Sequence, residues 1–272
     1  MANAAVCPAS SDADRESVPA PPAGGGRGAG LRRRVAILGL FTVLACALGV
    51  GGALFVRHAE RRIATLPMLV RAGLRREGEP LVGLGAIAPA LPAASVAVED
   101  RSFWTNPGIS FEGVARAAVV DFANAAWVEG GSTITQQLVR DELLGFQKTL
   151  HRKIIEMAYA VLVTIRFSKP EILTLYLNEV DYGNGAFGVA AAAHTYFDTT
   201  PAHLTLAECV LLAGLPQYPA GLDPFTHPRA ALERRAVVVA AMVHTHAISA
   251  AEGRRLDAQP LDLHAPHGAA GS

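Results

Sequence analysis

Residues 35–56, VAILGLFTVLACALGVGGALFV, form an apolar run without a single charged side chain. An α-helix rises about 1.5 Å per residue, so a run of this length spans a hydrocarbon core about 30 Å thick. The alternative is a cleaved signal peptide, whose apolar region usually covers only about 7–15 residues. The run therefore predicts one transmembrane helix.

The segments on either side of this run differ in character. Residues 1–34 are rich in Ala, Pro, Gly and Ser, a composition that cannot bury a core and predicts a disordered tail. Residues 57–85 place arginines among apolar positions, which is typical either of an amphipathic connector near lipid headgroups or of an ordinary surface helix. Because arginines flank the run on both sides, the positive-inside rule does not choose its orientation.

Between residues 86 and 250 the apolar positions follow a helical period almost throughout. Ser168 and Glu171 form a capping-box pattern at the start of SKPEILTLYLN, and Thr205 and Glu208 repeat it in LTLAECVLLAGLP. The alternation typical of strands is almost absent. The sequence therefore predicts a mainly α domain over this range.

Composition adds three limits. Hydrophobic residues make up 51% and charged residues 18%, and the 24 basic residues equal the 24 acidic ones, so charge does not point to a nucleic-acid partner. The three cysteines, Cys7, Cys46 and Cys209, lie in different regions, which argues against a disulfide framework. The last residues, 251–272, end in Pro, His, Gly and Ala and predict a flexible tail.

Several common motifs are absent or incomplete. YGNGAFG places Gly183, Gly185 and Gly188 in the G-x-G-x-x-G spacing of dinucleotide sites, but a capped helix precedes it where that motif needs a strand. The glycines therefore predict a tight turn between helices. No serine has lysine three residues later and no G-x-S-x-G occurs, so an acyl-serine mechanism has no candidate. The histidines show no metal-ligand spacing.

Three polar clusters could carry chemistry. Glu99 and Asp100 follow an apolar run in SVAVEDRSFW, where a carboxylate can serve as a general base, although such pairs are often simply solvated. GGSTITQQLVRD, residues 130–141, starts a helix with glycines and neutral polar side chains, a pattern that suits an anion or merely a capping box formed by Thr133 and Gln136. The third cluster is HRKIIEM, in which the spacing of Arg152, Lys153 and Glu156 puts them on one helix face; surface ion pairs are the alternative.

The order of these segments is informative. EDRSFWTNPG, GGSTITQQLVRD, RKIIE, KPEILTLYLN and GNGAFGVAAAAHTYF follow one another across roughly residues 90–240. This succession resembles the peptidoglycan glycosyltransferase family. Without a transpeptidase domain, the chain is most similar to the monofunctional biosynthetic transglycosylases, which are related to the glycosyltransferase domain of class A penicillin-binding proteins. The resemblance implies a lysozyme-like, two-lobed helical domain that polymerises lipid II and releases undecaprenyl diphosphate.

The resemblance also implies roles for particular residues. Glu99 would be the general base, and Glu156 would be a second catalytic carboxylate that orients cations of the chain or a divalent metal such as Mg or Mn. The remaining residues would bind the substrate and its diphosphate: Asp100, Ser132, Thr133, Gln136, Gln137, Arg140, Arg152 and Lys153.

The same resemblance implies a place in the cell. The protein would cross the bacterial plasma (inner) membrane once, with residues 1–34 in the cytoplasm and the domain on the outer side. Its partners would be lipid II, the growing glycan strand and other cell-wall synthesis proteins. We further expect part of residues 108–127, an apolar stretch between two motif segments, to dip into the bilayer; a buried helix pair is the alternative.

The chain departs from the family pattern at four places. Asn106 replaces the usual His, Arg140-Asp141 replaces Lys-Asn, Thr174 replaces Glu, and Asp198-Thr199 replaces Gly-Lys. These departures motivate one alternative, a catalytically weak scaffold of the cell-wall machinery. A lysozyme-like glycan hydrolase is a second alternative, although cleaving a glycan does not call for a cationic diphosphate site.

Overall fold

The computed structural model describes residues 26–110, 112–113, 131–145, 147 and 149–264. The chain divides into two compact units, Met1–Leu54 and Phe55–Ser272. Helices make up nearly all regular structure in the described ranges, where the strand-like pairing is an isolated bridge between Asp181 and Phe187. The mainly α prediction is confirmed. Most of the stretch predicted to dip into the bilayer lies outside the described residues.

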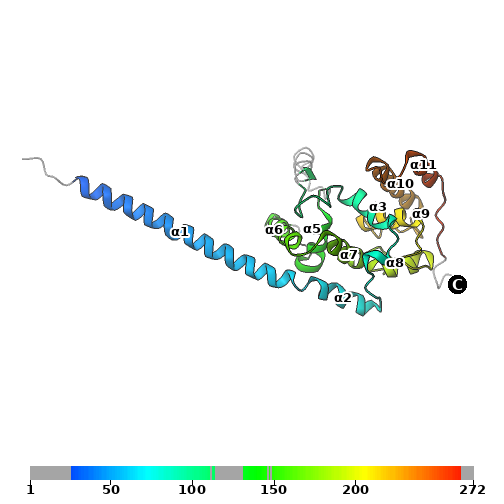
Figure 1. The fold of residues 1–272 in the computed structure, drawn as a ribbon, viewed down its shortest axis with the longest axis horizontal. Helices are drawn as coiled ribbons and strands as arrows, with labels where there is room; N and C mark the ends of the chain where they lie inside the picture. The colour runs from blue at the N-terminus through cyan, green and yellow to red at the C-terminus, as the bar shows by residue number, and fades with distance from the viewer. Residues whose placement is uncertain (1–25, 111, 114–130, 146, 148, 265–272) are drawn as a thin grey trace, which may run out of the picture. The chain divides into compact units, whose positions relative to one another are not determined.

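Helix α1 (Gly26–Ile63) contains the predicted transmembrane run (Figure 1). Its apolar side chains are exposed from Leu38 through Leu54. By length and composition it is the one helix in the described part of the chain that could cross a membrane; its most apolar window has a mean hydropathy of 2.2 and is 0% buried. The prediction of a disordered tail to residue 34 is wrong from Gly26 onward, because a helix already formed extends at little cost through neighbouring residues.

Helix α2 (Leu66–Glu77) is the connector, and it packs against α7 (Lys169–Glu179). It buries Leu66, Val70 and Leu74 and exposes its arginines, so it is amphipathic as predicted. Its contact with lipid stays a prediction.

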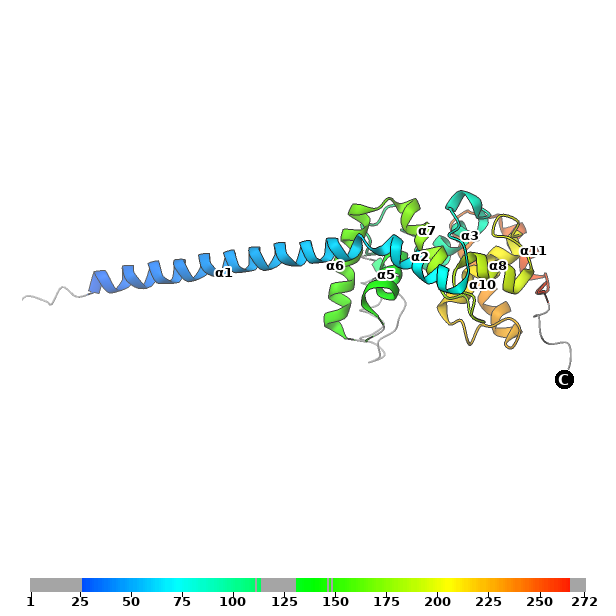
Figure 2. The same cartoon turned by 90° about the horizontal axis from the view of Figure 1, so that it is seen from below.

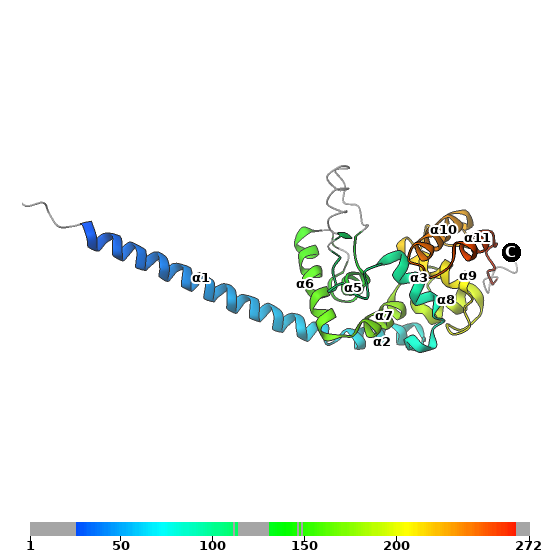
Figure 3. The same cartoon turned by 45° about the horizontal axis from the view of Figure 1, so that its top comes forward.

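The remaining helices of the second unit form two groups. In one, α3 (Ala90–Glu99), α9 (Leu206–Gly214) and α10 (Pro228–His244) pack together, with α11 (Ala250–Asp257) against α10. In the other, α5 (Ile134–Val139) packs against α6 (Leu150–Arg166) and α7, and α8 (Gly188–Phe197) covers α7. Figures 2 and 3 show α5 and α6 together, with α10 and α11 at the opposite end of this unit. Short helical turns complete it: η1 (Leu84–Ala86), η2 (Arg140–Leu144) and η3 (Leu215–Gln217).

Local sequence signals place the helix ends. Capping boxes are present at Ser168, Thr205 and Thr133, each with the predicted partner three residues later. Gly183, Gly185 and Gly188 all have positive φ and form the turn between α7 and α8. Gly188 is also crowded, since a Cβ there would lie 2.5 Å from the carbonyl oxygen of Asn178. The three glycines thus serve a helix–helix turn, as the sequence predicts.

The C-terminal segment differs from its prediction as a flexible tail. Ser249 and Glu252 form a further capping box that starts α11. After that helix, the amide of His264 donates to the carbonyl oxygen of Tyr196 at 2.8 Å, and the nearby leucines pack against the core. The prediction is wrong for residues 251–264 because polar composition concealed this cap and these few anchoring contacts; residues 265–272 lie outside the described ranges.

Candidate active site

Glu99, the last residue of α3, is held from two sides. Its Oε2 accepts a hydrogen bond from Gln137 Nε2 at 2.9 Å, and its Oε1 lies 3.1 Å from Arg234 Nη2. The side chain is only 14% exposed. Helices α3, α5 and α10 therefore meet at this carboxylate, and its orientation is fixed by an amide and a guanidinium.

Arg234 is a site residue that the sequence analysis missed. Its Nε donates to the carbonyl oxygen of Gly214 at 3.2 Å, so the guanidinium is braced while it pairs with Glu99. A Cβ on Gly214 would lie 2.9 Å from Cγ of Arg234, so the glycine makes room for this side chain. No motif surrounds Arg234 in the sequence, and 135 positions separate it from Glu99.

Asp100 points into the protein instead. Its oxygens accept from Asn106 Nδ2 at 2.9 and 3.0 Å, from Ser102 Oγ at 3.1 Å and from the amide of Ile134 at 3.3 Å. Burial raises the pKa of Asp100, and the hydrogen bonds from Asn106 and Ser102 oppose that shift. Since its acceptor positions face the protein, Asp100 fixes the start of α5; its predicted contact with substrate stays untested.

Two of the neutral side chains in GGSTITQQLVRD are also used internally. Thr133 Oγ1 donates to the carbonyl oxygen of Gly108 at 2.7 Å and accepts from the amide of Gln136 at 3.1 Å. Gln136 Nε2 in turn donates to Glu156 Oε1 at 3.3 Å. Both residues are 1% exposed. Thr133 also lines the polar cavity beside Glu99, and the contact of both residues with sugar or phosphate stays a prediction. Ser132 and Gln137 are half-buried.

The cationic cluster is confirmed in geometry. Glu156 Oε2 lies 2.9 Å from Arg152 Nη1, and Glu156 Oε1 accepts from Lys153 Nζ. Lys153 Nζ also donates to Ser132 Oγ at 2.7 Å. Glu156 is 1% exposed, so the alternative of exposed surface pairs is wrong. Two cations share one buried carboxylate, which leaves the cluster with an excess positive charge.

A divalent cation prefers oxygen ligands. At Glu156, however, both carboxylate oxygens already accept from Arg152, Lys153 and Gln136, and two of these partners carry positive charge. No group of three His, Cys, Asp or Glu residues in the described ranges could hold a metal ion. The residues around Glu156 therefore do not fit the divalent cation that the resemblance allowed.

Arg140 begins the π-helical turn η2, and its neighbour Asp141 binds it directly. Arg140 Nε and Nη2 lie 2.7 and 3.1 Å from the two carboxylate oxygens of Asp141. Burial raises the pKa of Asp141, and Arg140 opposes the shift. Asp141, which stands where the family pattern has Asn, thus pairs with Arg140, which the resemblance predicts to bind the diphosphate.

A polar cavity of about 130 Å³ lies beside Glu99. Glu99 and Ser132 both line it, so it brings the candidate base close to the hydroxyl that binds Lys153. Gly113 and Gly131 form part of the cavity wall. A Cβ on Gly131 would lie 2.6 Å from the carbonyl oxygen of Gly113, so any residue with a side chain would clash there. This close approach accounts for one of the two glycines in GGSTITQQL.

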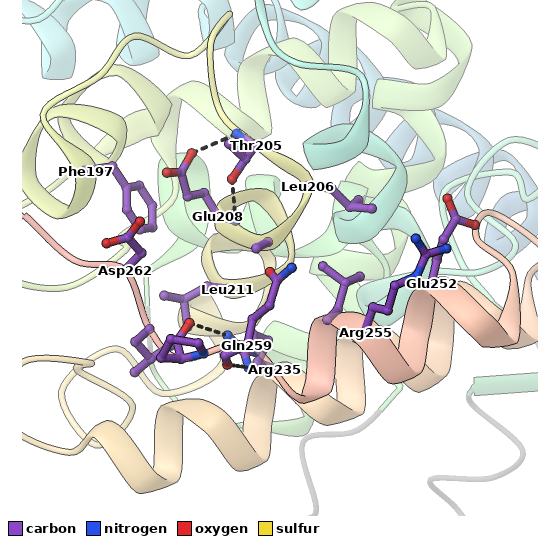
Figure 4. A pocket seen from close by; sticks show the side chains of 14 residues that line it. Phe197, Thr205, Leu206, Glu208, Leu211, Arg235, Glu252, Arg255, Gln259 and Asp262 are labelled. Carbon is purple, nitrogen blue, oxygen red and sulfur yellow. Dashed lines mark hydrogen bonds between the residues drawn. The ribbon is translucent and has the colours of Figure 1, made fainter.

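A larger cavity, about 700 Å³, lies among α9, α10, α11 and the segment that follows α11 (Figure 4). Arg235 lines it and donates to the carbonyl oxygens of Gln259 and Pro260, which fastens the C-terminal segment to α10. None of the predicted catalytic or substrate-binding residues lines this cavity, so it is separate from the candidate active site.

The model of the transglycosylase family matches residues 68–243, more than half of the chain. The chain belongs to the transglycosylase family. A Cupriavidus necator protein named "Putative transglycosylase" is 37% identical over 218 residues, which cover 79% of this chain and 93% of that protein.

Other relatives of this transglycosylase are longer. Penicillin-binding protein 1A of Aquifex aeolicus is 43% identical over 170 residues, covering 62% of this chain and 23% of that protein. The crystal structure of penicillin-binding protein 1A from Haemophilus influenzae aligns with a TM-score of 0.41 and 23% identity, covering 69% of this chain and 18% of that one. The chain therefore spans less than a quarter of the length of these two penicillin-binding proteins.

Proposed function

We propose that this transglycosylase is a peptidoglycan glycosyltransferase, which polymerises lipid II into glycan strands and releases undecaprenyl diphosphate. Membership of the family supports the reaction class. The observation that carries the proposal is the fixed position of Glu99 at the wall of a polar cavity, between Gln137 and Arg234. Ser132 lines the same cavity and links it to the cations of α6, where an anionic leaving group needs them.

The reaction needs one base and no acid. The 4-hydroxyl of the acceptor sugar attacks the anomeric carbon of the donor, and Glu99 takes the hydroxyl proton as the new C–O bond forms. The bond from the anomeric carbon to the diphosphate oxygen breaks, and its electron pair leaves with the diphosphate. Arg140, Arg152 and Lys153 neutralise the charge that develops there, and Glu156 keeps the last two side chains in place.

The proposed location follows from α1 and from the substrate. Helix α1 crosses the bacterial plasma membrane once, residues 1–34 face the cytoplasm, and the domain meets lipid II and the growing strand on the outer side. Other cell-wall synthesis proteins are proposed partners. A reporter that fluoresces only in the cytoplasm, fused after Ser272, should stay dark; bright cells would reverse the orientation.

The deciding experiment incubates the purified full-length protein with labelled lipid II. Polymer is the expected product. Glu99→Gln should lower its formation by about 10²–10⁴-fold without loss of lipid II binding, because only the proton acceptor is removed. Glu233→Gln, at an exposed ion pair on α10, is the matched control and should behave as the parent. A parent that leaves lipid II unchanged would favour the scaffold; the Arg140–Asp141 pair supports that alternative, because it occupies a cation that the diphosphate needs. Digestion of preformed glycan alone would favour a hydrolase.

A further inference from the structure

Lys169, the first residue of α7, reaches across to the segment that follows α3. Its Nζ donates to Asn106 Oδ1 at 2.9 Å and lies 4.7 Å from the centre of the Phe103 ring. The lysine is half-buried, and 63 positions separate it from Asn106. A charged side chain that is partly withdrawn from water to meet one amide oxygen has a specific place in the fold, unlike a solvated surface lysine.

Asn106 uses its whole hydrogen-bonding capacity in this place. Its Nδ2 donates to Asp100 and to Ser102, and its Oδ1 accepts from the amide of Gly108 at 2.9 Å as well as from Lys169. A carboxamide offers two donor hydrogens and two acceptor lone pairs, whereas an imidazole offers only two ring nitrogens. The histidine that is usual at this position could not reproduce these contacts together, so Asn106 and Lys169 form a combination of their own.

Two partners of Asn106 hold the start of α5. Asp100 accepts from the amide of Ile134 at 3.3 Å, and the carbonyl oxygen of Gly108 accepts from Thr133 Oγ1 at 2.7 Å. The same helix then carries the two glutamines that contact the catalytic carboxylates, Gln137 to Glu99 and Gln136 to Glu156. A shift of the first turn of α5 would therefore move both contacts at once.

We propose that Lys169 and Asn106 are positioning residues that set α5 relative to the two carboxylates. Lys169 holds Asn106, Asn106 holds Asp100 and Gly108, and these hold the first turn of α5. The proposal requires no contact between either residue and the substrate. The kinetic consequence rests on the proposed glycosyltransferase function, whereas the structural consequence does not.

The test uses Lys169→Met in the full-length protein. Amide hydrogen exchange of peptides that cover residues 131–139 should become about tenfold faster or more, since one charge-assisted hydrogen bond no longer supports the α5 start. With lipid II, kcat should fall about 10- to 100-fold and KM should change by less than about twofold, because misplaced groups affect the reacting geometry more than binding. Lys169→Arg can still donate to Asn106, so its exchange rates and its kcat should both stay close to those of the parent.

Arg166→Met is the matched control, because Arg166 is a nearby exposed cation that lies over Phe167 at 5.8 Å. It should leave exchange and kcat at parent values. Asn106→His provides a second route if Lys169→Met does not fold, because it should by itself speed exchange in residues 131–139. If Lys169→Met does fold, adding it to Asn106→His should have no further effect. Parent-like exchange and kcat in Lys169→Met, or additive effects in the double variant, would overturn the proposal. A parent that makes no polymer would remove the proposed function, while the exchange result would still decide on the positioning pair.

Discussion

Arg234 on α10 forms an ion pair with Glu99 at the end of α3, with 3.1 Å between Nη2 and Oε1. The two side chains are 13% and 14% exposed, so water screens their charges less than those of an exposed pair. The guanidinium balances the negative charge of the carboxylate, which must be ionised before it can accept a proton as a general base.

Arg234→Met should therefore reduce lipid II polymerisation by about 10- to 100-fold, because it removes one of the two groups that fix Glu99 and leaves the carboxylate without a cation. Arg234→Lys should retain part of the activity through its charge, though without the second contact to Gly214. The measurement is the initial rate of polymer formation, with circular dichroism to confirm folding. Arg229→Met is the control on the same helix, since Arg229 pairs with Glu233 in an exposed position. Parent rates in a folded Arg234→Met protein would show that Glu99 does not depend on this cation.

What the sequence could predict depends on how far apart the interacting residues lie in the chain. The capping boxes at Thr133, Ser168 and Thr205 were predictable because a residue and its partner three positions later meet on any helix. The Arg152–Glu156 pair follows from the same periodicity. The Arg234–Glu99 pair joins helices that only the tertiary fold brings together, so no local pattern could indicate it.

Burial was the other quantity that the sequence left open. GGSTITQQLVRD offers several neutral polar side chains, and composition alone does not say which of them face a ligand. In the structure Thr133 and Gln136 are buried and satisfied by the protein, whereas Ser132 and Gln137 meet Lys153 and Glu99. Gln136 and Gln137 are neighbours on α5 and so point in different directions, and which of them faces the core depends on contacts outside the segment.

Glu179, near the end of α7, should make stability depend on pH. Its Oε2 is buried and has no hydrogen-bond partner among the residues that the structure describes. Burial, together with the charges of Asp141 and Glu142, raises the pKa of Glu179 well above its ordinary value. The folded state thus binds this proton more tightly than the unfolded state, so stability should fall as pH rises from the unfolded pKa through the folded one.

Glu179→Gln removes this titration. The variant's melting temperature should therefore exceed that of the parent most at about pH 9 and least at about pH 5, when both are measured by differential scanning fluorimetry in detergent. Glu233→Gln, at an exposed residue, should track the parent throughout. A constant offset between Glu179→Gln and the parent at every pH would mean that this carboxyl is equally protonated in both states.

Glu156→Gln should affect stability and substrate binding together. Glu156 is the buried partner of Arg152 and Lys153, and removing one member of a buried ion pair typically costs about 3–5 kcal/mol. We expect the melting temperature to drop by roughly 10 °C for a domain of this size. Lipid II should also bind more weakly, since the two cations lose the group that aligns them. A variant with parent stability but no turnover would instead indicate direct participation of Glu156 in the chemistry.

Asp141→Asn should strengthen diphosphate binding. Asp141 contacts Arg140 through both carboxylate oxygens, at 2.7 and 3.1 Å, so an incoming diphosphate must compete with an anion that the chain itself supplies. An asparagine keeps the shape and removes the charge. We expect KM for lipid II and the inhibition constant of inorganic pyrophosphate to fall about three- to tenfold, within the range typical of close charge pairs.

Because burial raises the pKa of Asp141, acidification should protonate Asp141 and lower the parent's inhibition constant toward that of the variant. The variant's own inhibition constant should change less. The charges of Arg152 and Glu156 also act on Asp141. Glu142→Gln on the same turn is the control, because the cation that acts on Glu142 is Arg76. Equal pyrophosphate inhibition of Asp141→Asn and the parent would show that Arg140 does not bind the diphosphate.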